Sequence, residues 1–380
     1  MNSRFDDIRP YSDSEIPSAM HRIANDGLFP LLAPYVFPER GIEEVRNQIL
    51  SISTIHEFQT GVMYFANKRI IANSIKEFTT EGFENIERGK SYIYLSNHRD
   101  IMLDASLLQN ALIDHDFDTT EITFGANLMQ NKMVVDIGKS NKMFKVERPG
   151  KSIRSFYNSS KLLSEYIRNT ITQKHQSLWI AHRNGRTKDG IDRTDQGIIT
   201  MFRMSGGRDK VHSLEELNIL PVSVSYEWEP CDFLKTIEIW QKQKGPYIKK
   251  SGEDLNSILT GILQPKGRVH FQICKPISKE ELDRISSLPS NNFNKGVAEI
   301  VDQRICSSYH LWTNNYIAHD LLCGSDRYSS HYTPAQKGEF VNHLSKFEDY
   351  AEGGNLDELK QIFLGIYANP VDSAELFNEI

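Results

Sequence analysis

The sequence has few cysteines and no excess of positive charge. Four cysteines in 380 residues, none at C-x-x-C spacing, provide neither a disulfide framework nor a zinc or redox motif. The formal net charge is −6, with 44 Lys and Arg against 50 Asp and Glu, whereas nucleic-acid-binding proteins carry a broad basic surface. These features favour a reducing compartment and argue against nucleic acid as a partner.

Long apolar runs are also missing from the sequence. The strongest apolar stretch near the start, residues 28–37, is interrupted by Pro30 and Pro34, and no stretch approaches the roughly 18 apolar residues of a spanning helix. The first residues show no basic segment followed by an apolar run, so no secretory leader is expected. We expect a cytoplasmic protein that is soluble or lies on a membrane surface.

Both ends of the chain are predicted to be helical. Residues 1–75 carry apolar side chains at helical spacing, most clearly over residues 42–52. Residues 326–380 contain two patterns that start helices, at residues 333–336 and 355–358, and predict a small helical hairpin.

Between these ends, residues 76–325 alternate short apolar runs with helical stretches such as residues 153–171. The expected strands are 92–95, 122–124, 144–146, 178–181, 220–226 and 269–273. This alternation is typical of an α/β sheet flanked by helices.

The strand at residues 92–95 runs into Asn97 and His98, and a helix carrying Asp104 follows. A histidine at the end of a strand lies at the edge of the sheet where α/β active sites form. A carboxylate that folds back onto the ring would keep one nitrogen protonated and leave the other as a base. The alternative is a surface histidine beside a helix start, and this segment alone leaves both open.

Two segments are locally basic. Residues 132–154 contain seven Lys and Arg against two acidic residues, and a strand within them ends at Arg148. Residues 182–190 follow the expected strand at 178–181 and form a Gly-containing loop that carries Arg183 and Arg186. Arginine binds phosphate through two parallel hydrogen bonds, and Gly lets the backbone approach a ligand. The alternative for a charge run is a solvated face.

In this order, the His98 block, the strand ending at Arg148, the loop around Gly185 and the Pro-containing strand at residues 219–226 resemble the glycerolphosphate and lysophosphatidic acid acyltransferase family. The resemblance covers roughly residues 76–280, and the helical additions at both ends resemble a long bacterial form of that family. It implies an α/β mixed sheet flanked by helices, with the His block and the basic loops on one side.

The resemblance also implies residue roles. His98 would act as the general base, and Asp104 would fix the tautomer of its ring. The residues expected to bind the phosphate of the acceptor are Arg148, Arg183 and Arg186. Those expected to position the loop are Asn184, Gly185 and Thr187.

Two positions depart from the family pattern. Five residues separate His98 from Asp104 where the family has four, and one extra residue turns a helix by about 100°. Asp104 would therefore reach His98 only from a wider turn, and Asp100 is the alternative orienting residue. Asn184 stands where the family has Glu, which removes a charge and leaves the choice of acceptor open.

The implied function is O-acyl transfer, without a covalent acyl-enzyme, from acyl-CoA or acyl-carrier protein to a glycerolipid phosphate. The acceptor would be 1-acylglycerol-3-phosphate or glycerol 3-phosphate. Alternatives are transfer to an aminolipid or another lysolipid, and a non-catalytic relative that binds phospholipid. Neither a cofactor nor a metal is expected, because histidines such as His310 and His319 have no acidic neighbours at ligand spacing. His182 is interpreted as structural, as are Trp228 and Trp240.

A lipid acceptor and the missing spanning segment together predict peripheral binding to the inner face of the cell membrane. The expected contacts are residues 28–37 and 42–65 with the basic residues 132–154, since anionic lipid attracts basic segments. The alternative is that the N-terminal helices bury their apolar stripes against the rest of the protein.

Overall fold

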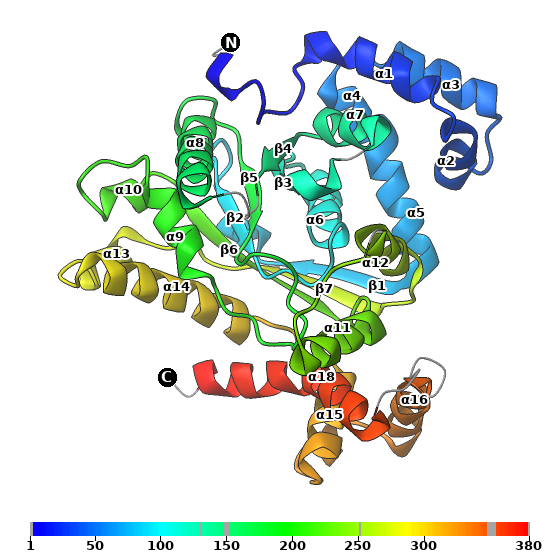
Figure 1. Ribbon diagram of the computed structural model, residues 1–380, viewed down its shortest axis with the longest axis vertical. Coiled ribbons are helices and arrows are strands. Elements are labelled where there is room, and N and C mark those ends of the chain that lie inside the picture. The colour runs from blue at the N-terminus through cyan, green and yellow to red at the C-terminus, as the bar shows by residue number, and fades with distance from the viewer. Residues whose placement is uncertain (1–2, 130, 148–151, 251, 348–354, 379–380) are drawn as a thin grey trace.

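The computed structural model describes residues 3–129, 131–147, 152–250, 252–347 and 355–378. A seven-stranded sheet lies at its centre, with strand order β1-β7-β6-β2-β5-β3-β4 (Figure 1). The strands are β1 (Ile75–Glu81), β2 (Ile93–Ser96), β3 (Glu121–Gly125), β4 (Met143–Val146), β5 (Leu178–Ala181), β6 (Ile219–Tyr226) and β7 (Gly267–Ile273). Strands β2 to β6 form a parallel set, whereas β7 runs antiparallel to β6 and parallel to β1. The expected mixed α/β sheet is confirmed.

Helices cover both faces of this sheet. Those associated with the sheet are α5 (Tyr64–Ser74), α6 (Leu103–Asp114), α7 (Lys132–Ser140), α8 (Ile153–Thr172), α9 (Gln196–Arg203), α10 (His212–Glu215), α11 (Asp232–Lys244), α12 (Glu253–Leu263), α13 (Lys279–Arg284) and α14 (Ser290–Ser307). On β2, Ile93 and Leu95 pack with side chains of α8, α9 and α14, whereas Tyr94 packs with side chains of α5 and α6. Successive side chains of a strand face opposite sides, so the buried central strand separates two apolar cores.

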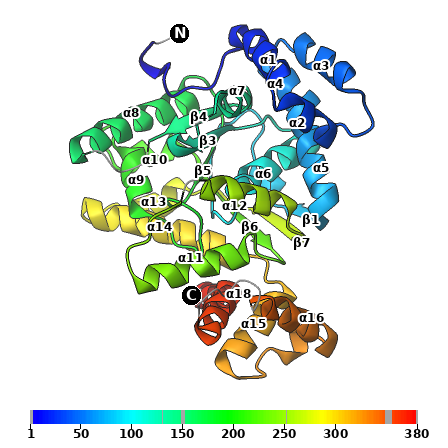
Figure 2. The ribbon, with the colours of Figure 1, turned by 45° about the vertical axis from the view of Figure 1, so that its right-hand side comes forward.

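Helical segments at the two ends of the chain lie at opposite ends of the molecule (Figures 1 and 2). The N-terminal helices are α1 (Ile16–Ala24), α2 (Phe29–Val36), α3 (Ile42–Ser51) and α4 (Ile55–Phe58), followed by a π-helical turn at Gln59–Met63. The C-terminal helices are α15 (Thr313–Cys323), α16 (Pro334–Ser345) and α18 (Leu356–Asn378). The division of the chain into three parts stays a prediction from the sequence.

The predicted elements agree with the structure wherever a continuous apolar run or a capping pattern marked them. All six expected strands are present as β2 to β7, and α16 starts with the capping box of Thr333 and Gln336. Strand β1 was not predicted. Its sequence, IKEFTTE, mixes charged and exposed positions because β1 is the edge strand of the sheet, and it therefore carries no apolar run.

The N-terminal helices bury most of their apolar stripe, as the alternative interpretation has it. Val45, Ile49 and Phe58 belong to one apolar cluster that includes Met133 of α7. The expectation that residues 42–65 form a membrane contact is therefore wrong for these side chains, because their free energy of burial goes into internal packing. In the described part of the chain, no helix combines the length and the apolar character needed to cross a membrane.

Candidate functional site

His98 lies two residues after the end of the central strand β2. Asn97 extends the strand's pairing with β6, because its side chain donates to the carbonyl of Val224 at 3.0 Å and accepts from the N–H of the same residue at 2.8 Å. The N–H of Thr187, in the loop after β5, donates to the carbonyl of His98 at 2.7 Å. His98 thus lies where three parallel strands end, which is the usual position of α/β active sites.

Asp104 reaches His98 despite the extra residue between them. The Oδ2 atom of Asp104 lies 2.9 Å from Nδ1 of His98. Residues 99–102 form a bend before α6 begins at Leu103, so a non-helical turn absorbs the spacing. The wider turn anticipated from the sequence is present, and it brings the predicted pair together.

Two backbone donors and one tyrosine hold the Asp104 carboxylate. Its Oδ2 accepts the N–H groups of Arg99 at 2.6 Å and Asp100 at 2.9 Å, and its Oδ1 accepts the hydroxyl of Tyr226 at 2.8 Å. Burial and the nearby Asp104 raise the pKa of Tyr226 well above its usual value, so Tyr226 remains a donor. With donors on both oxygens, Asp104 acts as an acceptor toward His98, which places the ring proton on Nδ1 and leaves the lone pair on Nε2.

Asp100, the alternative orienting residue, has a different task. Its Oδ1 accepts the N–H groups of Met102 and Leu103, both at 2.9 Å, and so caps the start of α6. Its other oxygen is buried and has no hydrogen-bond partner among the described residues. Asp104, and not Asp100, is therefore the residue that orients His98.

The loop after β5 brings Arg186 next to this block. Arg186 is only 8% exposed, and its Nη1 atom has no hydrogen-bond partner among the described residues. The guanidinium lies beside Cys231, where burial raises the pKa of the thiol and Arg186 opposes that rise. A buried guanidinium with an open donor fits an anionic ligand.

Of the other predicted loop residues, some form hydrogen bonds within the protein and one is exposed to solvent. Thr187 donates to Asp192 at 2.7 Å, and Gly185 takes a positive φ of 76° at the turn. Arg183 donates to the carbonyl of Ile191 within its own loop at 3.3 Å, and Asn184 is exposed. Arg148, the remaining predicted phosphate contact, lies outside the described residues.

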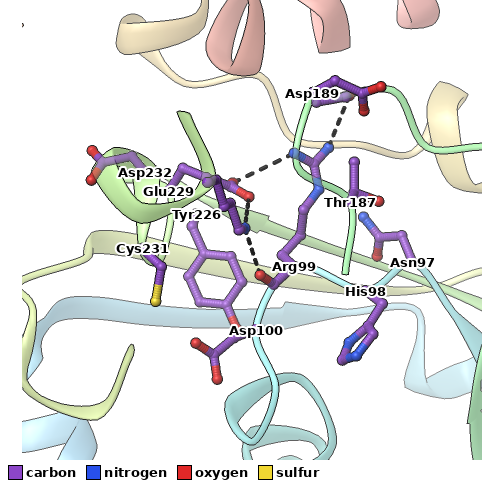
Figure 3. Close-up of polar contacts among 12 residues, drawn as sticks. Asn97, His98, Arg99, Asp100, Thr187, Asp189, Tyr226, Glu229, Cys231 and Asp232 are labelled. Carbon is purple, nitrogen blue, oxygen red and sulfur yellow. Dashed lines mark hydrogen bonds and ion pairs between the residues drawn. The ribbon is translucent and has the colours of Figure 1, made fainter. Parts of the chain in front are cut away.

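The sequence analysis did not predict the buried charge network behind His98. Arg99, almost fully buried, donates to Asp192 at 2.6 Å and to the carbonyl of Gly190 at 3.3 Å. Its Nη1 lies 3.5 Å from Glu229, a contact drawn in Figure 3. Burial disfavours the charge of Arg99, but Asp192 and Glu229 outweigh it and raise its pKa well above the usual value. Arg99 therefore stays cationic inside the protein.

A second buried cation completes the network. Lys235 of α11 donates to Glu229 and to the backbone carbonyl of Arg99, both at 2.6 Å. The two cations, Arg99 and Lys235, thus lie together with the two carboxylates of Asp192 and Glu229. This buried cluster adjoins the turn that carries His98. The position of Arg99 next to His98 was a signal in the sequence, but nothing marked Asp192, Glu229 or Lys235 as its partners.

The remaining predictions concern structural residues and metals. His182 is fully buried, and burial lowers its pKa to about 4, so the ring is neutral at pH 7. Trp228 and Trp240 pack against the C-terminal helices. Among the residues that the structure describes, no group of three or more His, Cys, Asp or Glu side chains is placed to hold a metal ion.

Comparison with known proteins supplies the deciding observation. Residues 77–225, which run from β1 to β6 and include the His98 block and the Arg186 loop, match the family model described as Acyltransferase. This segment is an acyltransferase domain, and the protein is an acyltransferase.

The acyltransferase is also similar to solved structures, among them the crystal structure of the 1-acyl-sn-glycerophosphate (LPA) acyltransferase PlsC from Thermotoga maritima. The identity is 13%, the match covers 76% of this chain and 94% of that chain, and the TM-score is 0.37. A search of curated proteins finds no match.

Proposed function

We propose that this acyltransferase moves a fatty acyl group from acyl-CoA or acyl-carrier protein to a hydroxyl group of a glycerolipid phosphate. The proposed acceptor is 1-acylglycerol-3-phosphate or glycerol 3-phosphate. The observation that carries the proposal is the 2.9 Å contact between Nδ1 of His98 and Asp104, at the ends of parallel strands within the acyltransferase domain.

His98 would perform the proton transfers of the reaction. Its Nε2 takes the proton of the acceptor hydroxyl as that oxygen attacks the thioester carbonyl, and a C–O bond forms. When the C–S bond breaks, the departing thiolate takes the proton back from the imidazolium and leaves as a thiol. Asp104 stabilises the imidazolium in between, and no cofactor takes part.

Arg186 is proposed to bind the phosphate of the acceptor. Support comes from its burial and from its open Nη1 donor. Lys188 in the same loop pairs with Glu238, so Arg186 is the cation that carries the proposal. A bound phosphate would hold the acceptor hydroxyl at His98 and so convert an intermolecular attack into an oriented one. The role of Arg148 stays a prediction from the family resemblance.

The choice of acceptor needs a panel, because Asn184 is exposed and supplies no charge. Purified protein would be incubated with each thioester donor and with phosphate-bearing, amino and neutral lysolipids, and the products would be read by lipid mass. His98→Ala should lower kcat by about 10²- to 10⁴-fold, the usual contribution of a general base. His56→Ala, at an exposed histidine, is the matched control.

A second arm of the same experiment tests the phosphate contact. Arg186→Ala should raise the KM for a phosphate-bearing acceptor more than for a neutral one, whereas Arg183→Ala should change both little. Full activity of the His98 variant would refute the base assignment. Exclusive use of an amino or neutral lysolipid by the wild-type protein would refute the phosphate acceptor.

We also propose that the protein binds the inner face of the cell membrane peripherally. Support comes from the start of α2, where Leu31, Leu32 and the preceding Leu28 are exposed. The basic residues 132–154 contribute less than expected, because Lys142 donates to Thr119 and Gln176 inside the protein and does not face solvent with the rest. Sedimentation should show binding to anionic vesicles that weakens with salt, and equal binding to neutral vesicles would contradict the electrostatic part.

A further inference from the structure

Helix α12 exposes its three leucines to solvent, while Ile262 on its other side packs against the core of the sheet. Leu255, Leu259 and Leu263 recur every four residues along one side of the helix and are 60%, 49% and 64% exposed. The fully buried positions of the helix are instead the small residues Ser257 and Gly261. A helix of a soluble protein normally buries its leucines and exposes its small and polar residues.

The buried side of α12 lies against the catalytic turn. A side chain on Gly261 would begin only 2.1 Å from Oδ2 of Asp100, so the helix backbone touches the turn that carries His98. The carbonyl of Ser257 accepts the thiol of Cys231 at 3.2 Å, and Cys231 lies beside Arg186. The row of exposed leucines lies on the side of the helix opposite these contacts.

The segment that leads into α12 is basic and also exposes an apolar side chain. Residues 242–254 contain four lysines and two acidic residues. Three of the lysines, Lys242, Lys244 and Lys249, form ion pairs with Glu238, Glu358 and Asp254 at the surface. Ile248 is 84% exposed, and Lys249 and Lys250 follow it at the surface. Apolar side chains next to lysines are complementary to a bilayer surface, which offers acyl chains below a layer of anionic headgroups.

Helix α5 lies between α12 and the N-terminal helix α2. Helix α12 packs against α5, and α5 packs against α2 with its exposed leucines. In both views the three helices lie next to one another at one side of the sheet (Figures 1 and 2).

We propose that Leu255, Leu259 and Leu263, together with Ile248, insert into an anionic membrane surface and dock the active site over its lipid acceptor. The inference rests on the proposed function, since it assigns the surface from which that acceptor enters. The occupant is the lipid leaflet, not a protein: three leucines and an isoleucine flanked by lysines form a narrow apolar row with a charged border.

The experiment replaces the leucines of α12 together, as Leu255→Ser, Leu259→Ser and Leu263→Ser. The matched control replaces exposed apolar side chains elsewhere, as Leu288→Ser, Val341→Ser and Leu376→Ser. Both are compared with the wild-type protein by sedimentation with vesicles of phosphatidylcholine and phosphatidylglycerol. Acyl transfer is measured to a long-chain 1-acylglycerol-3-phosphate in those vesicles and to a short-chain, water-soluble analogue. Equal thermal melts of the variants establish that each is folded.

The α12 variant should lose about tenfold or more of its vesicle affinity, because three exposed leucines no longer enter the apolar layer. Its KM for the vesicle-borne acceptor should rise by a similar factor, while transfer to the water-soluble analogue stays unchanged. The control variant should match the wild-type protein in both assays. The change Lys249→Gln with Lys250→Gln should weaken binding to anionic vesicles only.

Three results would overturn the inference. One is vesicle binding by the α12 variant at the wild-type level, and another is an equal loss of binding by the control variant. The third is a shift of the α12 variant from dimer to monomer with vesicle binding unchanged, which would make a second copy the occupant. Failure of the proposed function gives a different pattern: the wild-type protein binds vesicles through these leucines but acylates none of the glycerolipids.

Discussion

The helices at the two ends of the chain differ in how they are attached to the acyltransferase domain. The N-terminal helices join it mainly through an apolar cluster that includes Met133 of α7. The C-terminal helices reach the buried polar residues behind the active site. Both ends look alike in sequence, as helical additions. Among the described residues, however, only those of the C-terminal end contact groups that hold the catalytic turn.

The contacts of α18 show this difference. The Tyr367 hydroxyl accepts the N–H of Glu229 at 3.0 Å and donates to Asp232 at 2.8 Å. Asn369 donates to the carbonyl of Asp189 at 2.7 Å, and a side chain on Gly190 would begin 2.2 Å from the carbonyl of Ile366. Since Glu229 and Gly190 both contact Arg99, α18 supports the loop that carries Arg186 and the turn that carries His98.

The largest expected effect on stability comes from removing Arg99, the buried cation behind the catalytic turn. Arg99→Met would keep an unbranched apolar stem but remove the guanidinium, so that Lys235 would still pair with Glu229 while Asp192 would lose its arginine partner. We expect a loss of about 3–5 kcal/mol in the free energy of unfolding, the usual result of breaking a buried ion pair from one side. Urea unfolding followed by circular dichroism would measure it.

The control for Arg99→Met lies in the N-terminal helices. Glu44→Gln removes one charge from the exposed pair of Arg40 and Glu44 and should change the free energy of unfolding by less than about 0.5 kcal/mol. Equal effects of the two substitutions would mean that the buried network stabilises the fold no more than a surface pair does.

A smaller effect is expected from pH at the end of β5. His182 is buried, and burial lowers its pKa to about 4, whereas in the unfolded chain it titrates near pH 6.5. Between these two values the unfolded state binds the proton and the folded state does not, so stability falls as the pH falls through that window. Lowering the pH from 7.5 to 5 should therefore cost about 2 kcal/mol through this residue.

The pH effect is measured as a difference between variants. Urea midpoints at pH 7.5 and pH 5 would be compared for the wild-type protein, His182→Gln and His21→Gln, the last at an exposed histidine of α1. Only His182→Gln should lose part of the acid sensitivity. An unchanged pH dependence in that variant would mean that His182 is protonated as readily inside the fold as outside it.

The sequence predicts what its local patterns encode. Asp104 could be found because it lies six residues from His98, and β2 because its run is continuously apolar. The network around Arg99 could not be found, because its hydrogen bonds join residues 93 and 136 positions apart and no periodicity marks such pairs. Likewise, charge counting over residues 132–154 gave no sign that Lys142 points inward, since its burial depends on the packing around Thr119.

The smallest expected effect on stability is that of a substitution in α2. It tests how the N-terminal helices are attached to the acyltransferase domain. Leu31 is 71% exposed, whereas Val45 of α3 is buried in the N-terminal cluster. Leu31→Ser should change the free energy of unfolding by no more than about 0.5 kcal/mol, the usual range for a surface position, because little apolar area leaves the folded core.

Val45→Ser, measured by the same urea unfolding, should cost several times more, since it removes buried methyl groups and leaves a hydroxyl in an apolar cluster. A large loss from Leu31→Ser would mean that α2 is held by its leucines and contributes to the fold. A negligible loss would leave those leucines free to contact lipid.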